Sequence, residues 1–302
     1  MITARRVIHD PPRFPLNMAS NTVVADLHFP EAPRWREGRL WFSDFFSGQV
    51  ASVLPSGSDL RVEALVPEQP SGLGWLPDGR LLIVSMRDRR ILRRETDGVL
   101  VVHADLSEHV TGHLNDMVVD SLGRAYVGNF GFDMAVDADF APASLHRVDP
   151  DGTIVEVASD LWFPNGSVIT EAGTLLVNET FGNRITAFDL TSSGDLVNRR
   201  TWASFGPVPA GQDFSRILDQ VVVAPDGSCL GDDGDLWIAD AGGGRLLRLT
   251  GTGEVGDEIS PSAPVFACAI GEGTLFACTA PDFHEQPRKA ARDGRIISLT
   301  IS

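Results

Sequence analysis

The sequence repeats one short unit, and this repetition constrains the fold more than any other feature. In each copy an apolar run leads into a turn glycine and resumes as a second apolar run, as in residues 73–85 around Pro77-Asp78-Gly79. Six copies begin at about residues 31, 71, 115, 165, 219 and 266, at a spacing of roughly 40 to 54 residues. Periods of this length, made of short strands and glycine turns, are typical of propellers and solenoids.

Several copies contain two further strand-like runs. Asp97-Gly98 and Asp151-Gly152 are hairpin signals that follow a third run and precede a fourth one. Four antiparallel strands in each of six units predict an all-β fold, a six-bladed β-propeller.

The two ends of the chain fit a closed ring. The last copy supplies three strands, and residues 21–28 precede the first copy as one free strand. We expect this strand to complete the last blade and so remove an exposed sheet edge. The prediction is a single propeller domain over residues 1–302, with an N-terminal extension of about residues 1–20.

Charge and composition exclude several classes of partner. A formal charge of −16 disfavours nucleic acid and anionic membranes, and no apolar stretch reaches the length of a signal peptide or a membrane span. Cys229, Cys268 and Cys278 lack metal-type spacing, so we expect buried free thiols in a cytoplasmic protein, with a disulfide as the alternative. The sequence indicates no oligomeric state.

Four oxygen-bearing side chains occupy one register position of the repeat, at the start of a strand-like run. They precede Gly38, Gly123, Gly173 and Gly227 by seven or eight residues, and they are Glu31, Asn115, Asn165 and Asp219. Each alone has a plain alternative as a turn residue or a loop acid. Together, on the first strands that line a propeller channel, they predict a cage of two carboxylates and two amides. Such a buried cage requires a cation.

The donor atoms of this cage select the class of metal. Carboxylate and amide oxygens suit Ca²⁺, or Mg²⁺ and Mn²⁺, better than a soft metal. We expect Ca²⁺, because four protein ligands leave positions for water and substrate; Zn²⁺ and Fe²⁺ remain open alternatives.

Four motifs resemble those of the SMP-30/gluconolactonase/luciferin-regenerating-enzyme family over about residues 20 to 300. They are Pro30-Glu31-Ala32-Pro33-Arg34-Trp35, Leu114-Asn115-Asp116-Met117-Val118-Val119-Asp120, Pro164-Asn165-Gly166 and Leu218-Asp219. The resemblance implies a six-bladed propeller with one divalent cation in its channel and a hydrolase that opens lactones. It also implies that Glu31, Asn115, Asn165 and Asp219 hold the cation, that Asp219 is the general base, and that Asn115 also contacts the substrate.

One departure from the family concerns the substrate. Sugar-lactone members often carry an arginine two residues before the central asparagine, where this chain has His113. We therefore expect a less polar or differently charged substrate contacted by His113, with a hydrogen-bonded loop histidine or a proton shuttle as alternatives. The long segment of residues 128–143, which includes Phe132 and Met134, is expected to overhang one face as an apolar lid. Trp162 is expected to add an aromatic wall, with packing in the core as the alternative.

The resulting hypothesis is a metal-dependent lactonase acting on a small-molecule lactone. A phosphotriesterase-type hydrolase on the same cage and a non-enzymatic propeller scaffold are the alternatives. A scaffold predicts a plugged channel, whereas an enzyme predicts a ligand ring that faces an open pocket.

Overall fold

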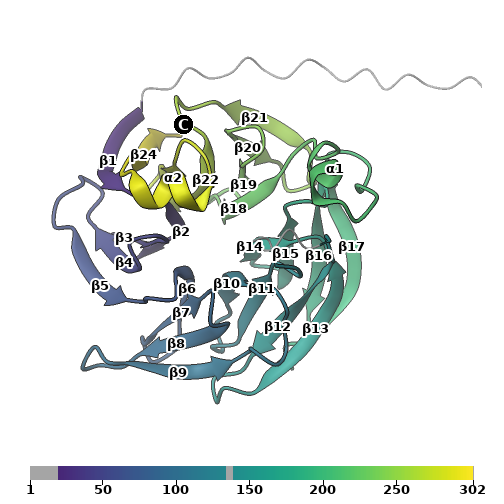
Figure 1. Cartoon of the computed structure of the whole chain (residues 1–302), viewed down its shortest axis with the longest axis horizontal. Helices are drawn as coiled ribbons and strands as arrows, with labels where there is room; N and C mark the ends of the chain where they lie inside the picture. Colours follow the sequence, from purple (N-terminus) through teal and green to yellow (C-terminus); the bar gives the residue numbers. More distant parts are fainter. Residues whose placement is uncertain (1–19, 134–138, 302) are drawn as a thin grey trace, which may run out of the picture.

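A ring of six four-stranded antiparallel sheets forms the protein in the computed structural model, which describes residues 20–133 and 139–301 (Figure 1). The prediction of a six-bladed propeller is confirmed. Most of the N-terminal extension, and Met134 in the long loop, lie outside the described residues.

Blades 1 to 5 follow one another along the chain, each with its strands in sequence order. Blade 1 is β2 (Pro30–Arg36), β3 (Arg39–Asp44), β4 (Gln49–Val53) and β5 (Arg61–Leu65). Blade 2 is β6 (Pro70–Trp75), β7 (Leu81–Ser85), β8 (Arg90–Arg94) and β9 (Leu100–Asp105). Blade 3 is β10 (Leu114–Val119), β11 (Ala125–Asn129), β12 (Ala143–Val148) and β13 (Ile154–Leu161). Blade 4 is β14 (Pro164–Ile169), β15 (Thr174–Glu179), β16 (Arg184–Leu190) and β17 (Leu196–Ser204). Blade 5 is β18 (Pro225–Leu230), β19 (Leu236–Asp240), β20 (Arg245–Leu249) and β21 (Val255–Ile259).

Blade 6 joins the two ends of the chain. It contains β22 (Val265–Gly271), β23 (Thr274–Thr279) and β24 (Gly294–Thr300), and its outer strand is β1 (Ser20–Leu27). β1 runs antiparallel to β24, with Ser20 opposite Leu299 and Leu27 opposite Gly294 (Figure 1). The expected closure by an N-terminal strand is confirmed.

Apolar side chains fill every junction between neighbouring blades. Six separate buried clusters occupy the six junctions; the one between blades 2 and 3, for example, contains Leu82, Val84, Met117 and Val127. Burial of this apolar surface is the main force that holds the blades together.

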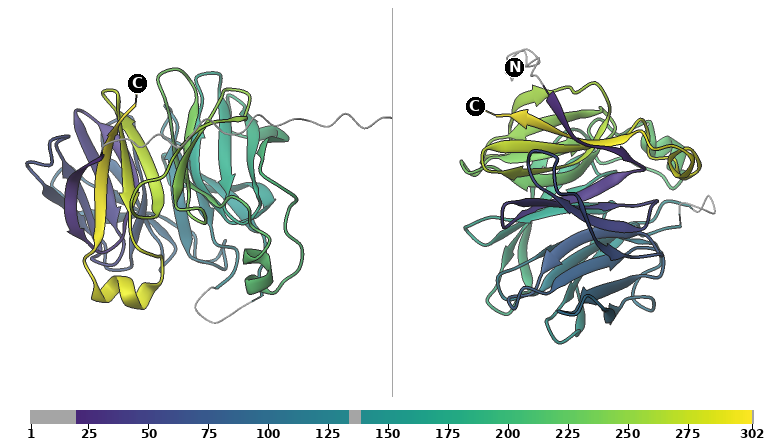
Figure 2. Two further views of the ribbon diagram at one scale, coloured as in Figure 1. Left: turned by 90° about the horizontal axis from the view of Figure 1, so that it is seen from above. Right: turned by 90° about the vertical axis from the view of Figure 1, so that its left-hand side faces the viewer.

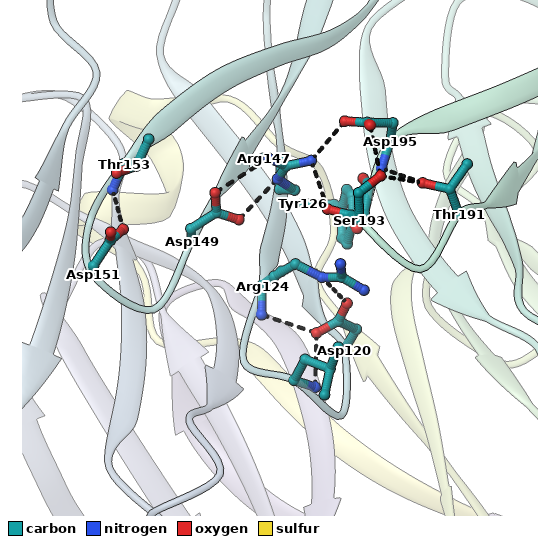
Figure 3. A network of polar contacts seen from close by, with 12 residues as sticks. Asp120, Arg124, Tyr126, Arg147, Asp149, Asp151, Thr153, Thr191, Ser193 and Asp195 are labelled. Carbon is teal, nitrogen blue, oxygen red and sulfur yellow. Dashed lines mark hydrogen bonds and ion pairs between the residues drawn. The ribbon is translucent and has the colours of Figure 1, made fainter.

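Polar contacts also join blades 3 and 4, between Arg124, Tyr126 and Arg147 of blade 3 and residues 192–195 of blade 4 (Figure 3). The hydroxyl of Tyr126 donates to the carbonyl of Gly194 at 2.9 Å, and Arg147 Nη1 lies 2.9 Å from Asp195 Oδ1. These contacts therefore join the two blades at this end.

Two short helices, α1 (Phe214–Leu218) and α2 (Glu285–Ala290), lie on the same face of the ring (Figure 2). Among the described residues, no helix has the length and apolarity needed to cross a membrane.

Candidate metal centre and substrate cavity

The innermost strands of four blades bring four oxygen-bearing side chains together at the ring axis. Glu31, Asn115, Asn165 and Asp226, the ring site, are the second residues of β2, β10, β14 and β18, and all are buried. Each lies at a β-bulge near the start of its strand, which follows the first residue in β10, β14 and β18 and follows Glu31 itself in β2. A bulge redirects side chains locally, which explains how the second residue of each strand points along the channel.

Glycines next to the ring site permit this close approach of strands. A Cβ atom on Gly166 would lie 2.4 Å from the carbonyl oxygen of Asp226, and one on Gly227 would lie 2.4 Å from Cβ of Ala267. Larger residues at these two positions would push the innermost strands apart, so the glycines set the width of the channel.

Asp219 is absent from this ring, and the prediction that it begins a strand of blade 5 was wrong. It is the exposed C-cap of α1 and does not line the cavity described below. Asp226 occupies the equivalent position, because Pro225 pairs with Asp240 in the same way as Pro164 pairs with Glu179. Glu31, Asn115 and Asn165 lie where the sequence places them.

Two carboxylates of the ring site are buried close enough to affect each other's ionisation. Burial raises the pKa of Glu31 to about 8, an effect opposed by the amide of Ala32, and the charge of Asp116 adds to the rise. Burial likewise raises the pKa of Asp226 well above its usual range, with the charges of Glu31 and Asp116 adding to it. Two carboxylates held in this way favour a proton or a bound cation.

Hydrogen bonds orient the two amides of the ring site. Asn115 Nδ2 donates to the carbonyl of Pro164 at 3.3 Å. Asn165 Nδ2 donates to Thr180 Oγ1 at 3.2 Å and also to Asp226 Oδ1. The amide nitrogens are thus engaged, and the amide oxygens are the atoms suited to a hard cation.

A third buried carboxylate, Asp116, forms an ion pair with Arg34. Arg34 Nη2 donates to Asp116 Oδ1 at 2.6 Å and to the carbonyl of Met117 at 2.8 Å. The charge of Arg34 also lowers the pKa of Glu31, but burial has the larger effect, and the pKa of Glu31 stays raised.

The donors of the ring site fit a hard divalent cation. Within residues 20–133 and 139–301, no group of three or more His, Cys, Asp and Glu side chains is arranged to hold a metal ion. The ring site has a different composition, with two carboxylates and two amides. All-oxygen donors of this kind suit Ca²⁺, Mg²⁺ or Mn²⁺.

Acidic residues at the ends of the second strands hold the ring strands in place. Asp44 Oδ1 accepts a hydrogen bond from the amide of Phe29 at 2.8 Å, and Asp240 Oδ1 accepts one from the amide of Ala224 at 2.9 Å. Phe29 and Ala224 each lie two residues before a carboxylate of the ring site. These strand-end acids therefore position the ring residues through the backbone.

We expect Asp240→Ala to lower the free energy of unfolding by about 3–5 kcal/mol, because its buried carboxylate is paired with Arg245 at 2.9 Å. Asp233→Ala is the matched control, since Asp233 pairs with Arg248 at the surface, where such pairs contribute less than about 1 kcal/mol. Urea unfolding at a fixed cation concentration measures both values. Equal losses in the two variants would contradict the positioning role of Asp240.

The ring site opens into a cavity of about 700 Å³, whose lining includes Leu218 of α1 and Glu285 of α2. His113 lines this cavity, and the centroid of its ring lies 5.6 Å from that of Phe130. Burial, with the nearby charge of Arg87, lowers the pKa of His113, so its imidazole is neutral at pH 7.

Phe132 and Trp162 do not line the cavity, so their predicted contact with a substrate finds no support in their positions. Both pack in the aromatic cluster behind the cavity wall, where the ring of Phe140 lies 5.2 Å from Phe132 and 4.6 Å from Trp162. Phe163 and Phe181, from the same cluster, line the cavity instead.

Several cavity residues were not singled out from the sequence. They are Phe29, Phe45, Phe46 and Phe266 from blades 1 and 6, and Gln69, Arg87 and Glu285 at the opening. A sequence signal for Asp226 does exist. The tripeptide Pro-X-Gly recurs at residues 70–72, 164–166 and 225–227, and its middle residue lies eight residues before Gly79, Gly173 and Gly234, respectively.

Comparison with known proteins relates the chain to one family and to several named relatives. The family described as SMP-30/Gluconolactonase/LRE-like region matches residues 29–280. Pentonolactonase XacC of Haloferax volcanii is 27% identical over 270 residues, 86% of this chain and 84% of that protein. Lactonase drp35 of Staphylococcus epidermidis is 26% identical over 265 residues, 82% of this chain and 72% of that protein. The crystal structure of regucalcin from Agrobacterium tumefaciens, named a calcium-binding protein, superposes with a TM-score of 0.75 at 21% identity, over 94% of each chain.

Proposed function

We propose that this chain, which belongs to the SMP-30/gluconolactonase/LRE-like family, is a divalent-cation-dependent lactonase. One observation carries the proposal: the buried carboxylates of Glu31 and Asp226 lie in one ring with two amides, at the bottom of an open cavity. The relatives named lactonase and pentonolactonase support hydrolysis of a cyclic ester as the reaction class.

Glu31, Asn115, Asn165 and Asp226 would hold the cation, and Ca²⁺ is our first choice on the chemistry of these donors. When bound, the cation supplies a Lewis acid for the lactone carbonyl. Its positive charge also favours the ionised forms of Glu31 and Asp226, whose pKa values burial otherwise raises.

Asp226 is the general base in this proposal. Its carboxylate accepts a proton from a water molecule while the water oxygen bonds to the carbonyl carbon. The ring C–O bond of the lactone then breaks, and the departing alkoxide oxygen takes the proton back from Asp226. The product is a hydroxy acid, and atoms and charges balance without any further reactant.

Other residues orient the reactants. Thr180 fixes Asn165 through its hydroxyl, which itself donates to the carbonyl of Pro225 at 2.9 Å. The neutral imidazole of His113 is placed at the cavity wall, where it offers a hydrogen bond to the substrate.

An open cavity above the ring site favours an enzyme over a scaffold, because a purely structural cation needs no space for a ligand. We propose a small-molecule lactone as the partner. We also propose a cytoplasmic location, which the three free cysteines support.

Hydrolysis assays with sugar, aliphatic and aromatic lactones test this proposal, with chelator and then with Ca²⁺, Mg²⁺, Mn²⁺ or Zn²⁺ added back. We expect hydrolysis of at least one class, its loss with chelator, and its return with a divalent cation. Absence of hydrolysis of every lactone under all conditions would refute the lactonase assignment.

A further inference from the structure

We propose that the substrate is a neutral lactone carrying an apolar aryl or alkyl substituent, and not a polyhydroxylated sugar lactone. This inference rests on the lactonase function proposed above. It follows from the aromatic walls of the cavity and from the state of the polar side chains that line it.

Aromatic side chains form two walls on opposite sides of the ring axis. Phe29 and Phe266, in contact at 4.8 Å between ring centroids, belong to blades 1 and 6. Phe130 and Phe163, stacked at 4.4 Å, belong to blades 3 and 4. In a ring of six, blades 3 and 4 lie across from blades 6 and 1 (Figure 1). A ligand above the ring site is therefore flanked by phenylalanines on both sides.

The rim of the cavity is apolar as well. Phe283 is 50% exposed, Leu218 is 40% exposed and Val222 is 59% exposed, and all three line the opening. Exposed large apolar side chains gathered at one cavity mark a surface that gains free energy when a ligand covers it. An apolar substituent that extends from the lactone ring toward the opening would cover these residues.

Most polar side chains in the lining are already paired with one another. Arg87 Nη2 lies 2.7 Å from Glu285 Oε1, and Arg87 Nε donates to Gln69 Oε1 at 2.9 Å. The hydroxyl of Thr180 is used by Asn165 and Pro225. A sugar lactone would bury several hydroxyl groups here against phenylalanines, and each buried hydroxyl without a partner is unfavourable.

The same pairing argues for a neutral ligand. Arg87 and Glu285 form an ion pair and cancel each other's charge. Among the described residues, they are the only Arg, Lys, Asp or Glu side chains that line the cavity outside the ring site, so this lining carries no unbalanced carboxylate, guanidinium or ammonium charge that would select an ionised substituent. His113 can form a hydrogen bond with one polar atom of the ligand. It lies beside Phe130, whose ring belongs to the aromatic wall on blades 3 and 4.

Steady-state kinetics with γ-lactones whose side chains run from methyl to hexyl test the proposal, with glucono-1,5-lactone as the polar comparison. We expect kcat/KM to rise by about three- to fourfold for each added methylene that is buried, until the substituent leaves the cavity. Glucono-1,5-lactone should be the poorest substrate. Equal or faster turnover of glucono-1,5-lactone, or no rise along the series, would overturn the inference.

A variant at the rim distinguishes binding of the substituent in this cavity from a general effect of substrate hydrophobicity. Phe283→Ala should reduce the hexyl-to-methyl ratio of kcat/KM by roughly 5- to 20-fold, as expected for losing part of one buried aromatic contact. Leu65→Ala is the control, because Leu65 is 63% exposed on the outer strand of blade 1, away from the cavity. A ratio unchanged in Phe283→Ala, or lowered equally in Leu65→Ala, would contradict the proposed position of the substituent.

Binding of lactams tests the proposed substrate class separately from the proposed hydrolysis reaction. Calorimetry with alkyl-substituted lactams and with the lactam of gluconic acid measures affinity for the cavity without hydrolysis. Tighter binding of the alkyl lactams supports the apolar substrate class even if no lactone is hydrolysed. Preference for the sugar lactam would refute the substrate class while leaving a lactonase function intact.

Discussion

Asp226→Asn is expected to lower kcat for lactone hydrolysis by about 10²- to 10⁴-fold, the range typical of losing a general base. The substitution keeps the size of the side chain but removes its charge and its ability to accept a proton. It also removes one of the two carboxylates of the ring site, so cation affinity should fall as well.

Asp219→Asn is the matched control for this experiment. Asp219 is an exposed C-cap residue outside the cavity, so we expect kcat and KM to stay within about twofold of the wild type. Thermal unfolding of both variants verifies that they are folded. The account is wrong about the base if Asp219→Asn abolishes turnover while Asp226→Asn retains it.

Removal of divalent cations should make stability fall as the pH rises from about 5 to 8. In the folded, cation-free protein Glu31 keeps its proton up to a pKa of about 8, whereas the unfolded chain releases it near the ordinary value of 4.5. The folded state therefore binds more protons in this window, and stability is lost as the pH rises through it. Each pKa unit corresponds to about 1.4 kcal/mol, so the change should be several kcal/mol.

Urea unfolding in chelator across this pH range measures the effect, and Glu31→Gln is the informative variant. Its amide does not titrate, so the part of the decline that comes from Glu31 should disappear, while the part that comes from Asp226 should remain. Added Ca²⁺ should restore wild-type stability at pH 8, because an ion that binds the folded state alone stabilises it. A cation-free wild type whose stability is constant or rises between pH 5 and 8 would contradict the buried state of these carboxylates.

The fold could be predicted from the sequence because its main determinant is periodic. Turn glycines and short apolar runs recur six times, and the missing strand of the last copy matches the surplus strand at residues 20–27. The turn residues and the closure of the ring both predict six blades, so errors of a few residues in the strand boundaries do not change the predicted architecture.

The ring site could be predicted only in part, because a glycine such as Gly227 can mark either a turn or a close approach of two strands. The dipeptide Asp226-Gly227 has the sequence of a hairpin turn. We therefore predicted the turn at Gly227 and the metal ligand eight residues earlier, at Asp219. In the structure Gly227 lies within β18, where the close approach of Ala267 on blade 6 requires a glycine. The turn belongs to Gly234, whose φ of +81° suits a residue without a side chain.

The cavity wall was the least predictable part because it depends on packing between distant blades. Phe132 and Phe163 lie in one aromatic cluster, yet only Phe163 faces the cavity. Phe29 and Phe266 are more than two hundred residues apart in sequence and meet only because the ring closes. Aromatic content indicates such clusters, whereas the face that each ring presents follows from tertiary structure.

Titration calorimetry of Ca²⁺ into the chelator-treated protein tests the central claim most directly. The account predicts one bound ion per chain for the wild type and for Asp219→Asn, and affinity at least about 100-fold weaker for Asp226→Asn. Binding to Asp226→Asn with wild-type affinity, or loss of binding in Asp219→Asn, would contradict the assignment of the cation to Glu31, Asn115, Asn165 and Asp226.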